Sequence, residues 1–383
     1  MQHYFDHNAT TPLCEPARRT WLEMESKHWH NPSSLYREAA EARQKLENCR
    51  ERLAELLGGC DPECIVFTSG ATEANNGLFR VFGDWGKTHA RLTGDGLPSG
   101  RRDGRVLISA YEHPSVREPA RKLCRALEVK MSELEEEIAN GSVRLLSWMA
   151  ANNENGVLFD WSQLARQSGL GRTIGFFHSD AAQWLGKMPA AALACGNPIL
   201  TASAHKFGGP KAVGFLRLPM PRQDFAWQLG GPQENGQRAG TENLPGIAAM
   251  IAALEHAESR LPGNPAPRDE FEARLEWPVV GGGQARLWNT SMVIAPRHDN
   301  RLWLARLSQR GFQCSTGSAC SSGQDGDSHV LAAMGLDSHE MKRVLRFSSG
   351  FDAASEDWMA LANALGEVQK SLDTRSVRAK AHA

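Results

Sequence analysis

The sequence has no apolar run that approaches the ~20 residues needed to cross a bilayer as a helix. Its first residues, MQHYFD, also lack the basic and apolar regions that mark a secretion signal. The sequence therefore indicates neither a membrane span nor an export signal. We expect the chain to work in the cytoplasm and to have no membrane partner.

An excess of charge of one sign is also missing. The chain has 43 lysines and arginines and 44 aspartates and glutamates, interspersed along its length. Binding to nucleic acid or to an acidic membrane surface would require a basic patch or stripe. We therefore expect no nucleic-acid partner, and we infer partners from candidate sites rather than from charge.

Paired cysteines are absent as well. Eight cysteines are scattered singly over 383 residues, which fits a reducing compartment better than a disulfide framework. Cys60 and Cys64 have no second cysteine pair with which to form a zinc site, and we expect no metal. The chain also contains no internal repeat, heptad pattern or low-complexity segment that would indicate an added binding module.

The chain is instead rich in alternating strand-like and helix-like segments. With 383 residues, of which 41% are hydrophobic, it can form a large α/β core and a second, smaller domain. Short apolar runs bounded by polar residues predict buried strands. Four of these strands lie at residues 106–109, 144–149, 174–177 and 199–203.

A polar cluster follows each of these predicted strands. The clusters contain Glu112-His113, Asn152-Asn153, Asp180 with Gln183, and His205-Lys206. Ligands of an open parallel sheet bind outside the carboxyl ends of its strands, so the four segments should converge on one crevice. Each residue alone could be solvated surface, but their convergence indicates a binding site.

Lys206 lies on a short polar turn between two apolar runs, in ILTASAHKFGGPKAVGFL at 199–216. A free lysine amine has a pKa near ~10.4, so it is a nucleophile only where neighbours or a covalent partner neutralise it. A Schiff base with an aldehyde cofactor would do so. The alternative is a solvated turn lysine, as most lysines are.

A second candidate site follows the predicted strand at 64–67. The small, polar stretch TSGATEANN opens a helix there, and the backbone amides of Gly70, Ala71 and Thr72 could hold a phosphate. An ordinary capped turn between a strand and a helix is at least as common. The hydroxyl groups of the stretch favour the anion site only slightly.

The remaining elements are predicted from apolar spacing and from glycine and proline breaks. The basic, glycine-rich segment 83–105 indicates a surface insertion. We expect the strand near Tyr4 to join the smaller domain. Helices are expected at 38–57, at 243–261, near 302–310 and from about Ser355, and a further strand is expected at 290–294.

Nine short motifs occur along almost the whole chain. They are DHNATTP (6–12), NPSS (31–34), FTSGATEANN (67–76), EH (112–113), NNENG (152–156), SDAAQ (179–183), SAHKFGGPKAVG (203–214), RAGTEN (238–243) and STGSACSSG (315–323). In this order they resemble the cysteine desulfurases, which are pyridoxal-phosphate enzymes of the class V aminotransferase group.

The resemblance implies the fold-type I architecture, in which helices flank the mainly parallel sheet of a large domain and a smaller α+β domain is attached. We expect the large, cofactor-binding domain at 13–252. Residues 1–12 and 253–383 would form the small domain, which carries a catalytic cysteine loop.

The resemblance also implies roles around the cofactor. Lys206 would bind the aldehyde and shuttle the substrate's α-proton, and Asp180 would pair with the protonated pyridine nitrogen because an anion there keeps the ring an electron sink. His113 would stack on the ring and exchange protons. Gln183 would hydrogen-bond the phenolic oxygen, and Asn153 would lie beside that oxygen and the substrate carboxylate.

Phosphate binding is implied for a further set of residues. Ala71, Thr72, Ser203 and His205 would hold the phosphate from one subunit. Thr241 would reach the same phosphate from a second subunit. The resemblance therefore implies a homodimer whose active site contains residues of both copies.

Arg346 matches the arginine that would clamp the substrate carboxylate as a bidentate pair, for which lysine geometry is poor. The alternative is an arginine at the surface end of a helix. The sequence LRFS at 345–348 does not by itself decide between the two.

Cys320 lies in a stretch that is too small and hydrophilic to pack a core, so we expect an exposed loop. In the family, the matching thiolate attacks the sulfur of the cofactor-bound cysteine and leaves alanine and an enzyme persulfide. Cys314, Cys124 and Cys195 have no such setting and are predicted to be core or incidental thiols.

Three positions depart from the family pattern: Tyr36, Trp288 and Asn235. None of them removes a catalytic group. We expect L-cysteine as the substrate and a sulfur-acceptor protein as a partner, but the sequence does not identify that protein.

Two other hypotheses stay open. One is a selenocysteine lyase or another class V enzyme with the same fold and cofactor, in which Cys320 is idle. The other is a non-catalytic scaffold that delivers sulfur. Retention of Lys206, Asp180, His113, Arg346 and Cys320 argues against the scaffold, which would need none of them.

Overall fold

The computed structural model describes residues 3–88, 104–159, 174–222, 224–317 and 327–381. The chain forms two compact units. Unit 1 contains Met1–Thr11, Asn152–Leu158 and Pro262–Ala383, and unit 2 contains Pro12–Ala151 and Phe159–Leu261. Cys320 and most of the expected insertion at 83–105 lie outside the described residues.

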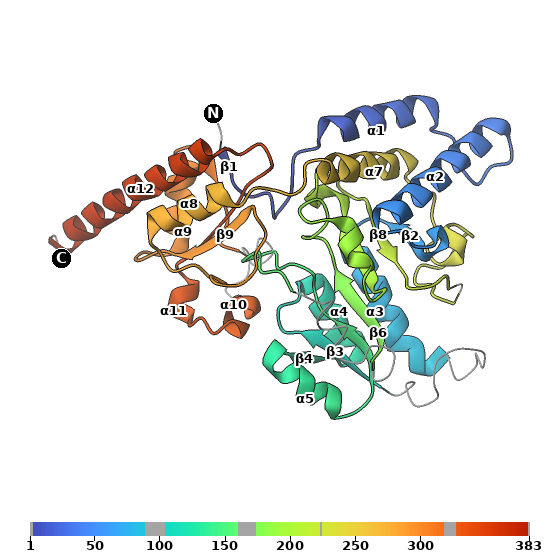
Figure 1. Cartoon of the computed structure of the whole chain (residues 1–383), viewed down its shortest axis with the longest axis horizontal. Coiled ribbons are helices and arrows are strands. Elements are labelled where there is room, and N and C mark those ends of the chain that lie inside the picture. The colour runs from blue at the N-terminus through green and yellow to red at the C-terminus, as the bar shows by residue number, and fades with distance from the viewer. Residues whose placement is uncertain (1–2, 89–103, 160–173, 223, 318–326, 382–383) are drawn as a thin grey trace. The chain divides into compact units, whose positions relative to one another are not determined.

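Unit 2 is built on a seven-stranded sheet with the order β2-β8-β7-β6-β5-β3-β4 (Figure 1). Its strands β3, β5, β6 and β7 run parallel, and only β8 is antiparallel to its neighbours. The predicted mainly parallel sheet is therefore confirmed. The strands are β2 (Ile65–Thr68), β3 (Arg105–Ser109), β4 (Leu127–Val129), β5 (Val143–Ser147), β6 (Ile174–Asp180), β7 (Ile199–Ser203) and β8 (Gly214–Arg217).

Helices cover both faces of this sheet because its strands alternate buried side chains between two cores. Leu107 of β3 packs in one core, and its neighbours Val106 and Ile108 pack in the other. The first core includes α1 (Glu15–Lys27), α2 (Arg37–Leu56) and α7 (Leu244–Glu258), and the second includes α3 (Ala71–Thr88) and α4 (Pro114–Cys124). A short helix, α5 (Leu134–Ala139), follows β4.

Helix α2 shows why the local sequence pattern was informative. Ala39, Ala42, Leu46 and Leu53 are buried at helical spacing, which places them on one face. The helix ends before Gly58, whose φ of 95° favours glycine. The prediction of a helix at 38–57 is confirmed to within a residue at each end.

Unit 1 contains two small sheets. Strands β9 (Thr290–Ile294) and β11 (Val344–Ser348) pair antiparallel, and β1 (His3–Tyr4) pairs in parallel with β10 (Phe312–Gln313). The N-terminal strand therefore lies in unit 1. The helices are α8 (Ala266–Leu275), α9 (Asn300–Ser308), α10 (His329–Ala333), α11 (Ser338–Met341) and α12 (Ser355–Ala381).

The segment Asn152–Leu158 belongs to unit 1, although the boundaries expected from the sequence place it in the large domain. The reason lies in its backbone pairing. The Leu158 N–H donates to the Ala285 carbonyl at 2.8 Å, and the Leu287 N–H donates to the Gly156 carbonyl at 2.7 Å.

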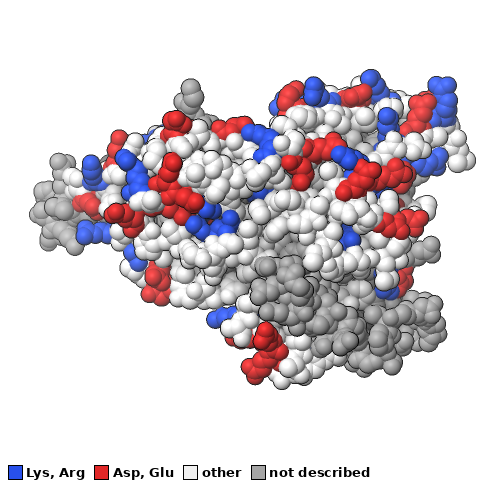
Figure 2. Space-filling model, viewed as in Figure 1, with Lys and Arg blue, Asp and Glu red and all other residues white. Residues whose placement is uncertain are grey.

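Charged side chains of both signs are interspersed on the face drawn in Figure 2. This distribution agrees with the balanced composition. Among the helices of the described ranges, none is both long and apolar enough to span a bilayer.

Candidate active site

Lys206 lies directly after β7, in the short 3-10 turn Ala204–Lys206. The Ala204 N–H donates to the Val213 carbonyl at 3.0 Å, which ties the turn to the start of β8. Lys206 is half-buried, whereas Lys211 in the same loop is exposed. The setting of Lys206 is therefore not that of a fully solvated turn lysine, which Lys211 represents.

Asp180 ends β6, the strand next to β7, and is only 5% exposed. Its Oδ2 accepts a hydrogen bond from Asn75 Nδ2 at 3.0 Å, and its Oδ1 accepts from the Ala182 N–H at 2.9 Å. Both donors are neutral. The carboxylate is thus held at the carboxyl edge of the sheet by dipoles of α3 and of its own turn.

The turn from β2 to α3 is closed tightly against the end of β7. The Ala71 N–H donates to Ser203 Oγ at 2.7 Å. A Cβ at Gly214 would lie 2.6 Å from the Gly70 Cα, so glycine is required for this approach. Thr72 is exposed on the first turn of α3. The structure therefore groups Ala71, Thr72 and Ser203 at a helix N-terminus, where an anion is favoured.

The pKa of His205 reflects the positive electrostatic potential around it. Burial first, and then the charges of Lys206, Lys211 and Lys187, lower its pKa to about 4. The ring is therefore neutral at pH 7 and has one N–H to donate. Three ammonium groups close enough to act on it also make the place favourable for a phosphate.

Gln183 is buried beside a lysine that the sequence analysis missed. Lys187 is only 4% exposed, and its Nζ donates to Gln183 Oε1. The available signal was a single lysine within the otherwise apolar run WLGKMPAAA. A lysine in such a run is seldom buried without a partner.

His113 caps α4. The Ser115 N–H donates to His113 Nδ1 at 3.1 Å, and Ser115 Oγ lies 2.8 Å from the same atom. Because Nδ1 accepts, a neutral ring carries its proton on Nε2. The preceding residue, Glu112, is fully buried.

Arg346 lies in unit 1, at the centre of β11, and is only 1% exposed. The alternative of an arginine at the surface end of a helix is therefore wrong. Its Nη2 donates to Asp6 Oδ1 at 2.6 Å, and its Nη1 donates to the carbonyls of Asn153 at 2.9 Å and Gly317 at 2.6 Å. Asn153 thus lies with Arg346 in unit 1, while the other described candidates lie in unit 2.

Thr241 is exposed on the loop that precedes α7. The same loop is tied to α3 because Arg238 donates to Glu73 at 2.9 Å. Cys320 lies outside the described residues.

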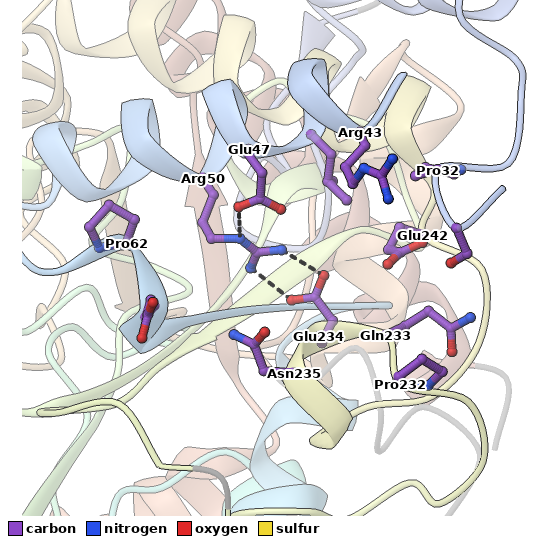
Figure 3. A pocket seen from close by; sticks show the side chains of 13 residues that line it. Pro32, Arg43, Glu47, Arg50, Pro62, Pro232, Gln233, Glu234, Asn235 and Glu242 are labelled. Atoms are coloured by element: carbon purple, nitrogen blue, oxygen red, sulfur yellow. Dashed lines mark hydrogen bonds and ion pairs between the residues drawn. The ribbon is translucent and has the colours of Figure 1, made fainter. Parts of the chain in front are cut away.

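A cavity of about 390 Å³ lies elsewhere in unit 2 (Figure 3). Figure 3 shows the buried pair at its wall, in which Arg50 donates to both oxygens of Glu234 at 2.8 and 2.9 Å. Glu234 also accepts from the Phe67 N–H at 2.8 Å. None of the predicted cofactor or substrate residues lines this cavity, and the ion pair instead anchors the loop that carries Thr241 to the sheet edge.

The residues grouped in unit 2 fit the cofactor that the sequence resemblance implies. Lys206 would supply the amine, and Asp180 presents a carboxylate whose hydrogen-bond donors among the described residues are the neutral Asn75 side chain and the Ala182 N–H. The glycine-tight turn at Gly70 and the neutral His205 suit a phosphate. The donor set therefore matches an aldehyde, a basic ring nitrogen and a phosphate in one ligand.

Comparison with known proteins agrees with this assignment. The family model described as aminotransferase class-V matches residues 3–265. A cysteine desulfurase of Klebsiella pneumoniae is 34% identical over 369 residues, covering 91% of this chain and 87% of the relative. One of Sinorhizobium fredii is 31% identical, with 98% of each chain covered. A solved structure described as a NifS-like protein has a TM-score of 0.82 at 27% identity and covers 98% of this chain and 100% of that chain.

Proposed function

The chain belongs to the class-V aminotransferase family, among its cysteine desulfurases with the fold-type I architecture. We propose that unit 2 binds pyridoxal phosphate, which the desulfurase reaction requires. The substrate is L-cysteine and the product is L-alanine. One observation carries the proposal. Asp180 ends β6 and Lys206 follows the neighbouring parallel strand β7. The turn between β2 and α3 is hydrogen-bonded to the end of β7 through Ala71 and Ser203.

Pyridoxal phosphate, when bound, supplies an aldehyde that captures an amine and a ring that takes up an electron pair. Lys206 would hold the aldehyde through Nζ and would move the proton of the substrate Cα. Asp180 would keep a proton on the ring nitrogen. Gln183 would donate to the phenolic oxygen, and His113 would contact the ring and exchange protons.

The phosphate is assigned to the small-residue turn. The turn at Ala71, whose N–H holds Ser203 Oγ, the hydroxyls of Thr72 and Ser203, and the neutral N–H of His205 would bind it. Thr241 of a second copy completes the site, and the enzyme is therefore proposed to be a homodimer. The exposed position of Thr241, on a loop that Glu234 anchors, supports its contact with a second copy.

Arg346 and Asn153 are assigned to the substrate carboxylate. A guanidinium binds a carboxylate in a planar, two-bond geometry that orients the substrate. Arg346 is rigidly placed on β11, which supports an orienting role.

Cys320 is assigned the sulfur. Its thiolate bonds to the sulfur of the bound cysteine while the Cβ–S bond breaks, and Cβ takes up a proton. The net reaction converts the Cys320 thiol and L-cysteine to a Cys320 persulfide and L-alanine. Two further thiols release sulfide and become a disulfide, or an acceptor protein takes the sulfur.

The compartment is proposed to be the cytoplasm. The seven cysteines of the described residues are all free thiols. This state supports a reducing environment.

The test of the function is incubation with L-cysteine and a thiol reductant, with alanine and sulfide measured. Lys206→Ala should abolish both products and the absorption of the bound cofactor. The matched control is Lys211→Ala, because Lys211 is exposed in the same loop. Wild-type protein that binds the cofactor but forms no alanine would refute the proposal.

A second experiment tests the role of Cys320. A serine hydroxyl is far less ionised than a thiol of pKa near ~8.5, so Cys320→Ser should stop alanine release but keep cofactor binding. Cys314→Ser is the control, because burial raises the pKa of that thiol to about 12. Full turnover of cysteine in Cys320→Ser would indicate a lyase or transaminase instead.

A further inference from the structure

Six buried polar side chains form a continuous hydrogen-bonded file through unit 2. It begins at the turn after β3 and runs across β5, β6 and β7 and onto α3. Five of the six are fully buried, and Asp180 is 5% exposed. In order, the file contains Glu112, Ser147, His178, Thr201, Asn75 and Asp180.

The direction of these bonds can be derived from the Asp180 end. A carboxylate only accepts, so the Asn75 group that faces it at 3.0 Å is the amide NH2. The carbonyl oxygen of Asn75 then points to Thr201 Oγ1, at 2.7 Å, and it also only accepts. Thr201 must therefore donate its single hydroxyl proton to Asn75.

The next bonds follow from this assignment. Because Thr201 has used its proton, it accepts from Nε2 of His178 at 3.1 Å. A neutral ring with its proton on Nε2 has an accepting Nδ1, and Ser147 Oγ lies 2.8 Å from that atom. Ser147 must therefore donate to His178.

The contact between Ser147 and Glu112 determines whether Glu112 donates or accepts. Ser147 has used its only proton, yet its Oγ lies 3.2 Å from Glu112 Oε1. Two oxygen acceptors would repel each other there. Glu112 must carry the proton and donate it to Ser147, as a neutral carboxylic acid.

One other assignment satisfies the same distances. His178 could carry two protons, and Ser147 would then donate to an ionised Glu112. Burial opposes both charges, since it lowers the pKa of His178 to about 3. Burial, and next the charge of Asp180, raise the pKa of Glu112 well above its usual range and outweigh the smaller lowering by hydrogen bonds with Ser147 and the Met149 backbone. The neutral assignment is therefore favoured.

We propose that Glu112 is a positioning residue, a neutral carboxylic acid whose proton fixes the direction of this file and holds the Asn75 amide toward Asp180. Every bond then donates one step closer to the Asp180 carboxylate. The consequence for the cofactor rests on the proposed function, because it requires Asp180 to face the ring nitrogen. The direction of the bonds does not depend on it.

The direct test is spectroscopic and uses the cofactor-loaded protein. Infrared difference spectra of wild type and Glu112→Gln should show a protonated carboxyl C=O band that only wild type has. Nitrogen-15 NMR of labelled histidine, assigned with His178→Gln, should show a neutral His178 with a bare Nδ1. A carboxylate at Glu112 or a doubly protonated His178 would overturn the proposal.

Two variants of similar length test the consequence for Asp180. Glutamine can donate to Ser147 as the acid does, whereas methionine cannot. Glu112→Gln should keep the wild-type cofactor spectrum, and Glu112→Met should shift the spectrum and weaken cofactor affinity about tenfold, the worth of a lost buried hydrogen bond. Glu118→Met, in an exposed pair on α4, is the control.

Equal loss of affinity and equal spectral change in Glu112→Gln and Glu112→Met would overturn the proposal. If Glu112→Met does not fold, the infrared and NMR results on wild type and Glu112→Gln still decide it. Correct spectra in a protein that forms no alanine would refute the proposed function and leave the positioning role intact.

Discussion

In unit 1 the buried guanidinium of Arg346 lies 2.6 Å from the carboxylate of Asp6. In unit 2 the buried carboxylate of Asp180 accepts from two neutral groups, the Asn75 side chain and the Ala182 N–H. These two groups are thus stabilised in different ways. Arg346 has a counter-ion, as Arg50 of unit 2 has in Glu234, whereas Asp180 is stabilised by dipoles.

The difference has consequences for the stability of each unit and for its use. A counter-ion concentrates the stabilisation in one partner, so its loss leaves an uncompensated buried charge. Dipoles spread the stabilisation over several groups, each of which contributes less. Under the proposed function, a substrate carboxylate would meet a guanidinium already engaged by Asp6, whereas a cationic ring nitrogen would meet a carboxylate whose hydrogen-bond donors among the described residues are neutral.

The largest expected effect comes from neutralising the counter-ion. Asp6→Asn keeps the shape but leaves Arg346 buried with neutral acceptors only. Loss of one partner of a buried pair costs about 3 to 5 kcal/mol, and we expect about 3 because the Asp6 side chain is 22% exposed. Hydrogen exchange of the β11 amides, read by mass spectrometry, measures the local free energy of opening.

The matched control in unit 1 is Glu367→Gln. Glu367 forms an ion pair with Arg310 in which its side chain is 70% exposed, so little change is expected. If Asp6→Asn costs no more than this control, the counter-ion description of unit 1 fails.

The next effect is a loss of stability in acid that arises from His178, a buried residue of unit 2. The pKa of His178 is about 3 in the folded state, below the ~6.5 of an unfolded histidine. Between these two values the unfolded chain binds more protons, so the free energy of unfolding falls as pH falls. The slope rises to about 1.4 kcal/mol per pH unit as the unfolded histidine becomes protonated, which gives a loss of about 2.3 kcal/mol between pH 6.5 and 4.5.

His178→Gln removes this term because glutamine does not titrate. Urea unfolding of wild type and variant at several pH values should give curves whose separation narrows as pH falls. Titrating carboxylates common to both proteins cancel in the difference. A constant separation from pH 6.5 to 4.5 would show that His178 is not buried as a neutral ring.

A smaller effect is expected from the same chemical change at Asp180. Asp180→Asn places an amide NH2 against one of two N–H donors, so one hydrogen bond is lost at about 1 to 2 kcal/mol. Exchange of the β6 and β7 amides measures it. If Asp180→Asn lowers the local free energy of opening as much as Asp6→Asn does, the contrast between Asp180 and Arg346 does not hold.

The sequence was sufficient for the parts of the site that follow strand ends. Lys206 and Asp180 were assigned to one sheet edge because parallel strands end at one edge, and the parallel pairing of β6 with β7 agrees with this placement. Local patterns also predicted β7 and β9 without error in either boundary. Periodicity and turn residues therefore located these elements.

Contacts between distant residues were not predictable in this way. Thr201 and His178 lie within apolar strands, where a polar residue gives no sign of its partner. The pair of Asp6 and Arg346 joins residues 340 positions apart. Such partners depend on strand register and packing, which no local pattern encodes.

The smallest effect is expected from salt. The Debye length falls from about 10 Å at 0.1 M to about 3 Å at 1 M, but screening requires ions near the charges. Arg346 is only 1% exposed, so ions cannot surround it. The coupling energy of Asp6 and Arg346, from a double-mutant cycle with Asp6→Asn and Arg346→Met, should change by less than about 0.5 kcal/mol between 0.05 and 1 M NaCl.

The exposed pair of Arg52 and Glu255 in unit 2 serves as the reference, with side chains 47% and 43% exposed. Its coupling should be small and should fall further with salt, because exposed charges are screened. The two cycles together separate a desolvated pair from a solvated one. If the coupling of Asp6 and Arg346 also falls with salt, water and ions reach Arg346, and the counter-ion in unit 1 is then no more buried than a surface pair.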